Sequence, residues 1–73
     1  MRMIPMESGN LHSLGYDPDA MELEVFFKPN MTHYKYQAVP AEEVCAVLFA
    51  ESQGGEFNKR IVKGGYPYEK LGL

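Results

Sequence analysis

The sequence is poor in the residues that stabilise small secreted or membrane proteins. It has one cysteine, no tryptophan and no apolar run close to the roughly 18 residues of a membrane span. Because a disulfide needs two cysteines and Cys45 is the single one, the chain cannot form an internal disulfide. The first residues, Met1 to Glu7, are too short and too interrupted for a signal peptide. We therefore expect a cytoplasmic protein with no membrane partner.

What the chain does contain is ordinary globular composition. Of its 73 residues 45% are hydrophobic and 23% are charged, with five tyrosines and four phenylalanines as bulky side chains. This length predicts one domain over residues 1–73, in which only about 60% of the unfolded surface becomes buried.

The net charge of −3 is unevenly distributed along the chain. Residues 1–56 hold three basic and nine acidic residues, a balance of −6, whereas residues 57–73 hold four basic and one acidic residue, a balance of +3. Lysine and arginine neutralise phosphate backbones. Any polyanion is therefore expected to bind the C-terminal quarter.

Three segments predict β-strands, at residues 8–16, 21–28 and 32–38. The second alternates apolar and polar side chains from Met21 onward with the period of a half-buried strand. Turn sequences at Asp17-Pro18-Asp19 and Pro29-Asn30 separate the three. Such short connections favour an antiparallel meander.

The second turn determines which side chains share a face of the sheet. With an even number of turn residues, Val25 lies opposite Tyr34 and Leu23 lies opposite Tyr36. Opposite charges are then paired on the other face, where Glu24 meets Lys35. An odd turn would move every side chain to the other face. We expect the even register, with both tyrosines on the apolar face.

Two helices are predicted after the strands. Pro40 suits a first helical turn, and the spacing of Val44, Val47 and Leu48 is helical. Cys45 and Phe49 are expected to widen its apolar face.

Gly54-Gly55 is expected to end this first helix. Phe57 and Ile61 then indicate a second, shorter helix over 56–63, followed by an extended tail. The predicted fold class is α+β: a three-stranded antiparallel β-meander followed by two α-helices packed on one face.

This order of elements resembles the KTSC domain family, named after the C-terminal extension of some lysyl-tRNA synthetases. The resemblance covers about residues 8–71. It rests on seven motifs in order: "GYD" at 15–17, "LEVFF" at 23–27, Y-x-Y at Tyr34 and Tyr36, "VP" at 39–40, "AES" with a following glycine at 50–54, "FNKRI" at 57–61 and "YPYEKL" at 66–71. The chain departs from the family at Pro29-Asn30-Met31, where members often have glycine.

The resemblance implies a small non-enzymatic module of phage or bacterial origin, with RNA as the suggested ligand. The Y-x-Y pair allows two interpretations. Tyr34 and Tyr36 could stack on unpaired bases, or they could belong to the core beneath the helices. We expect the core, because the helical layer has to cover the face that both share with Leu23 and Val25.

The predicted nucleic-acid site is the basic segment near the C-terminus. It offers cations for phosphates and aromatic rings for bases; its residues are Asn58, Lys59, Arg60, Lys63, Tyr66 and Tyr68. The alternative is that these are solvated side chains of a short helix. A second functional hypothesis is a protein-interaction module, for instance a phage protein that modulates a host factor through the open sheet face with Phe26 and His33.

No pattern indicates catalysis, a cofactor or a metal. His12 and His33 lack the spacing of zinc ligands, and Cys45 is expected to fill the core rather than to react. We therefore expect a binding protein rather than an enzyme.

Overall fold

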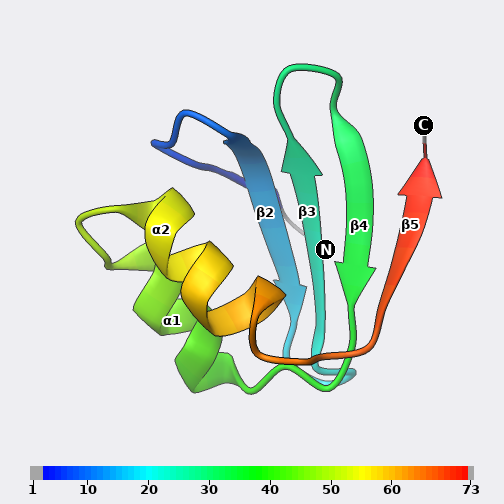
Figure 1. The fold of residues 1–73 in the computed structure, drawn as a ribbon. Helices are drawn as coiled ribbons and strands as arrows, with labels where there is room; N and C mark the ends of the chain where they lie inside the picture. The colour runs from blue at the N-terminus through cyan, green and yellow to red at the C-terminus, as the bar shows by residue number, and fades with distance from the viewer. Residues whose placement is uncertain (1–2, 73) are drawn as a thin grey trace.

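An antiparallel sheet of five strands forms one layer of the fold, and two helical segments lie against one of its faces (Figure 1). The computed structural model describes residues 3–72. Its strands are β1 (Met3–Pro5), β2 (Leu11–Asp17), β3 (Glu22–Phe27), β4 (Thr32–Tyr36) and β5 (Tyr68–Gly72), in that spatial order. Between β4 and β5 come α1 (Ala41–Leu48), α2 (Gln53–Phe57) and the π-helix η1 (Asn58–Val62).

The α+β class and the helices on one face are confirmed, but the prediction of three strands is wrong. β1 has only three residues and includes Pro5, so it carries no recognisable alternation. β5 comes from the tail that was expected to be extended, and it pairs with β4 at the edge of the sheet. Its side chains are exposed from Tyr68 to Leu71, which removes the alternation that marks a half-buried strand.

The predicted register between the second and third strands of the meander is confirmed. The turn has four residues, 28–31, and Leu23 pairs with Tyr36 as Val25 does with Tyr34. The charged pair of Glu24 and Lys35 lies on the opposite face. Leu23 and Val25 are fully buried.

The ends of the strands differ from the predicted ones. β2 begins at Leu11 because Ser8 belongs to a turn in which its Oγ accepts the backbone N–H of Asn10 and of Leu11. Met21 and Ala38 have φ values of 55° and 60° and lie in turns outside β3 and β4. Residues with a Cβ rarely adopt this left-handed conformation. The apolar pattern of the sequence therefore could not show that the strands stop short of Met21 and Ala38.

The first predicted helix is confirmed as α1, although it is shorter and narrower than expected. Val44 and Val47 are buried and Leu48 is half-buried. Cys45 and Phe49 were expected on the apolar face, but both are exposed, Phe49 to 87%. The helix ends at Leu48, and Phe49, four residues after Cys45, lies on its outer side.

Gly54-Gly55 does not end a helix but lies in the first turn of α2, where Ser52 Oγ accepts the N–H of Gly55. A Cβ at Gly54 would lie 2.6 Å from Oδ1 of Asn10, so any larger residue there would have to displace the Asn10 side chain in the loop before β2. Phe57 and Ile61 are buried, as predicted. They anchor α2 and η1 to the core.

The core lies between the helical layer and the inner face of the sheet. It consists of Met6, Leu11, Leu14, Leu23, Val25, Tyr36, Val39, Val44, Val47, Phe57 and Ile61. The members that belong to strands come from β2, β3 and the end of β4. In Figure 1 the helices lie toward the β2 side of the sheet, and β5 forms the opposite edge.

Candidate functional site

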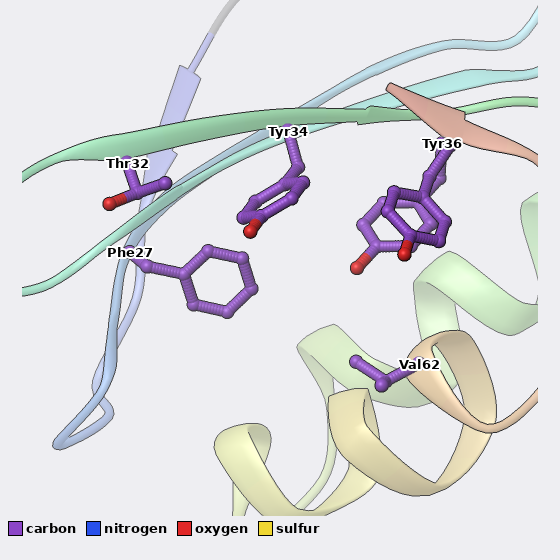
Figure 2. Close-up of a pocket in the computed structure, with 6 residues that line it drawn as sticks. Phe27, Thr32, Tyr34, Tyr36 and Val62 are labelled. Carbon is purple, nitrogen blue, oxygen red and sulfur yellow. The ribbon is translucent and has the colours of Figure 1, made fainter. Parts of the chain in front are cut away.

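An aromatic pocket of about 500 Å³ opens where the helical layer ends and β4 and β5 continue. Its lining residues are Phe27, Thr32, Tyr34, Tyr36, Val62 and Tyr68. Figure 2 shows the rings of Tyr34 and Tyr36 projecting from β4 toward the helices, with Val62 of η1 facing them. The volume lies within the range of small-ligand sites, which are concave and mostly apolar.

The three tyrosines of the pocket form a gradient from the core to the surface. Tyr36 is 5% exposed and Tyr34 is partly buried, whereas Tyr68 is 65% exposed. Tyr68 pairs with Tyr36 across β4 and β5, so the two rings share a face. The expected place of Tyr36 in the core is therefore confirmed. On the same face of the sheet, however, the ring of Tyr68 is exposed to solvent.

The rings contact one another and leave ring faces and edges exposed to the pocket. The centroid of Tyr68 lies 5.5 Å from that of Tyr36 and 6.0 Å from that of Tyr34. Phe57 contacts both Phe27 and Tyr36 at 5.7 and 5.8 Å in edge-to-face arrangements. Such contacts hold aromatic rings in fixed orientations. The pocket is consequently a preformed surface.

The tyrosine hydroxyls add polar groups to an otherwise apolar pocket. Within residues 3–72, the hydroxyls of Tyr34, Tyr36 and Tyr68 form no hydrogen bond with protein atoms, whereas Tyr16 donates to the carbonyl of Val39 at 2.6 Å. Burial, with smaller contributions from Tyr34 and Tyr68, raises the pKa of Tyr36. Its hydroxyl is therefore protonated at neutral pH and can donate to a ligand.

The structure divides the predicted nucleic-acid site between two elements. Lys59 and Lys63 are exposed on and just after η1, while Tyr68 lies on β5 inside the aromatic pocket. Tyr66 is partly buried and packs against the core. Asn58 lines a separate polar hollow beside the loop before β2.

Arg60 belongs to the same predicted site, but its guanidinium already has two acidic partners. Nε donates to Glu56 and Nη1 donates to Glu43, each at 2.7 Å. The hydrogen bonds to Glu56 and then Glu43 raise the pKa of Arg60, and the bond from Arg60 lowers the pKa of Glu56. Arg60 thus joins α1 to the second helical segment, and two of its N–H groups are already donated to carboxylates.

Lys70 was not among the residues predicted for the nucleic-acid site, but the structure places it beside Tyr34. Lys70 is exposed and is the cross-strand partner of Tyr34, so its side chain starts on the face of the sheet that carries the pocket. Within residues 3–72, Lys59, Lys63 and Lys70 form no ion pair, in contrast to Lys35 and Arg60. Lys70 is one of the four basic residues counted in the C-terminal segment, but its place beside Tyr34 follows only from the pairing of β5 with β4.

The opposite face of the sheet carries paired charges. Glu24 contacts His33 Nε2 at 2.7 Å, and Glu22 lies 3.6 Å from Lys35 Nζ. The ring of Phe26 stacks on His33 with a centroid distance of 4.2 Å. This is the face of the alternative, protein-binding hypothesis; its carboxylates make it unfavourable for phosphates.

The described part of the chain has neither a cluster of metal-ligating side chains nor a helix that could cross a membrane. No group of three or more histidine, cysteine, aspartate or glutamate side chains in residues 3–72 has metal-binding geometry. No helix in that range is long and apolar enough to cross a membrane.

Known proteins share both the sequence pattern and the fold. An uncharacterized protein of Stutzerimonas stutzeri (strain A1501) is 41% identical over 71 residues, which are 97% of this chain and 99% of that protein. The crystal structure of a KTSC domain protein from Yersinia pestis superposes with a TM-score of 0.85 at 32% identity, covering 97% of each chain. The sequence model of the KTSC domain matches residues 7–66, from the turn before β2 to the residue that follows the glycines after η1. The chain therefore belongs to the KTSC domain family.

Proposed function

We propose that this protein is a small non-enzymatic module that binds single-stranded nucleic acid, RNA in particular. The observation that carries the proposal is the combination of an open aromatic pocket with three exposed lysines on the two elements that border it: Lys59 on η1, Lys63 directly after η1, and Lys70 on β5. Proteins that bind single strands without strong sequence preference combine stacking rings with cations that follow the backbone.

The distribution of charge supports this face over the rest of the protein. No aspartate or glutamate lines the pocket. The outer face of the sheet, by contrast, carries Glu22 and Glu24. A phosphate chain is therefore repelled by the acidic body and attracted to the end of η1 and the edge strand β5.

This proposal changes the role of one predicted residue. Because Arg60 is held by Glu43 and Glu56, we assign it to positioning η1 rather than to binding phosphate. Lys70 takes its place among the cations, since it neighbours Tyr34 across β4 and β5.

The test is the salt dependence of binding to a single-stranded RNA of about twelve nucleotides. The double variant Lys63→Ala/Lys70→Ala is compared with Lys28→Ala/Lys35→Ala, in which two lysines are removed elsewhere. Both variants change the net charge from −3 to −5. Each lost phosphate contact lowers the slope of log K against log salt by about 0.7 for a single strand.

We expect the first double variant to lower that slope by about 1.4 and the second to leave it near the parent's value. Equal losses in both would show that net charge, not this site, governs binding. No detectable RNA affinity of the parent at low salt would refute the proposal. Binding of a protein partner with little salt dependence would favour the outer face with Phe26 and His33 instead.

A further inference from the structure

The aromatic pocket has two walls of different chemistry. The sheet provides Tyr34, Tyr36 and Tyr68, and η1 provides Val62, which is 50% exposed although it directly follows the buried Ile61. Figure 2 shows Val62 facing the tyrosines across the pocket. A planar ring that enters here meets π-faces on one side and an aliphatic side chain on the other.

The wall formed by η1 is held firmly in place. Phe57 and Ile61 anchor the segment in the core, and Arg60 ties it to α1 through Glu43. η1 itself is a π-helix, a rare conformation that recurs at functional sites. The gap between Val62 and the sheet is therefore a property of the folded protein.

The charges beside the pocket select among the ligands that such rings can bind. Tyrosine cages also accept quaternary ammonium groups by cation–π attraction. A cation would here approach Lys70, the cross-strand partner of Tyr34, and Lys63, which follows Val62 in the chain, with no carboxylate in the lining to compensate. A flat ring that carries a phosphate fits both the rings and the lysines.

We propose that the pocket is a slot for one unstacked nucleobase, held between the tyrosines of β4 and β5 and Val62 of η1, with its phosphate toward Lys63 and Lys70. This inference rests on the proposed function and specifies how the strand is bound. A base inside a duplex is stacked and paired on both sides, so the slot takes bases from single strands only. Hydroxyl groups both donate and accept hydrogen bonds, so the three tyrosine hydroxyls accommodate different base edges. We expect affinities for oligo(A) and oligo(U) within about tenfold of each other.

The decisive variant is Tyr68→Ala, with Leu71→Ala as its matched control. Both residues are exposed on β5, but Tyr68 lines the pocket and Leu71 does not. Loss of one base stack lowers affinity by about 5- to 150-fold. We expect Tyr68→Ala to show a loss in this range, Tyr68→Phe to keep most of the affinity and Leu71→Ala to bind like the parent.

A second measurement uses NMR titration of the parent with adenosine monophosphate, ribose 5-phosphate and tetramethylammonium. The nucleotide should shift the ring resonances of Tyr34 and Tyr68 and the methyl resonances of Val62, whereas the other two compounds should not. A shift by tetramethylammonium but not by the nucleotide would overturn the slot.

The failure of the slot and the failure of the proposed function look different. If RNA binds through the lysines but Tyr68→Ala behaves like Leu71→Ala, or a duplex binds as well as its single strands, the slot is wrong and the nucleic-acid proposal remains. If adenosine monophosphate binds and no RNA does, the pocket is a binding site for a free nucleotide and the proposed function is wrong.

Discussion

One face of the sheet faces the helices along β3, β4 and β5, but the helices cover its two ends differently. In β3, Leu23 and Val25 lie under the helices and are fully buried. In β4 and β5, their neighbours on the same face are Tyr36, Tyr34 and Tyr68, and exposure rises toward the edge. Tyrosine suits such a boundary because its ring packs against apolar groups while its hydroxyl tolerates water. The uncovered end of an apolar face is thus where this small domain can offer a binding site.

The largest expected effect separates the buried tyrosine of this face, Tyr36, from the exposed one, Tyr68. Tyr36→Ala removes a buried ring that contacts Phe57 and should cost about 3–5 kcal/mol of unfolding free energy. Tyr68→Ala should cost only about 0.5–1 kcal/mol, since that ring is mostly exposed. Urea unfolding of the two variants measures both values. Similar costs would mean that the two rings are equally protected.

A smaller effect is expected at the turn that joins β3 to β4. Met31 has φ = 55°, a left-handed conformation that costs an L-residue about 1–2 kcal/mol, and its side chain is exposed. Glycine relieves this strain but loses more chain entropy on folding, about 0.5–1 kcal/mol. Met31→Gly should therefore stabilise the protein by about 0.5–1 kcal/mol in thermal or urea unfolding.

The control for this variant is Met31→Ala, which keeps a Cβ at the same backbone angles and should gain nothing. A loss of stability in Met31→Gly would show that the methionine side chain contributes more through packing than the backbone loses through strain.

The smallest effect concerns the ion pairs that attach η1, the outer wall of the pocket, to α1. The hydrogen bond from Arg60 lowers the pKa of Glu56 below its usual 4.5. A carboxyl group with a lowered folded-state pKa stabilises the protein above its unfolded pKa, and this contribution is lost as the pH falls through the folded value. Stability should therefore decrease below about pH 4.5, and Glu56→Gln should show less of this decrease.

Glu51→Gln serves as the control in the same acid titration, followed by circular dichroism. Glu51 is exposed and forms no ion pair within residues 3–72, so its removal should leave the acid profile as it is in the parent. Identical profiles for all three proteins would mean that the contact with Arg60 contributes nothing in solution.

Much of the fold was predictable from local patterns. The period of two in β3, the turn at residues 28–31 and the charge pairing of Glu24 with Lys35 together specified the register with β4. The inward positions of Val44, Val47, Phe57 and Ile61 followed from helical spacing. These features depend on residues that are close in sequence, so the pattern of this single sequence is enough to predict them.

The errors arose where distant segments meet. Gly54 resembles a helix end, but it lies in the first turn of α2, where its small size accommodates Asn10, more than forty positions earlier. Phe49 matches an apolar helical face, yet the helix has already ended and the side chain points away from the core. The contact of Arg60 with Glu43 of α1 was likewise not predictable from the local sequence.

The sequence by itself determined the class of the fold, the central register and the basic character of the C-terminal segment, because each follows from composition or short-range periodicity. Only the tertiary structure decided that β5 returns beside β4, bringing Tyr68 and Lys70 to Tyr36 and Tyr34. It also decided how far the helices extend across the sheet. Alternation shows which face of a strand is apolar, but not whether a helix covers it. The aromatic pocket exists because that cover reaches Tyr36 at the end of β4 but leaves Tyr68 on β5 exposed.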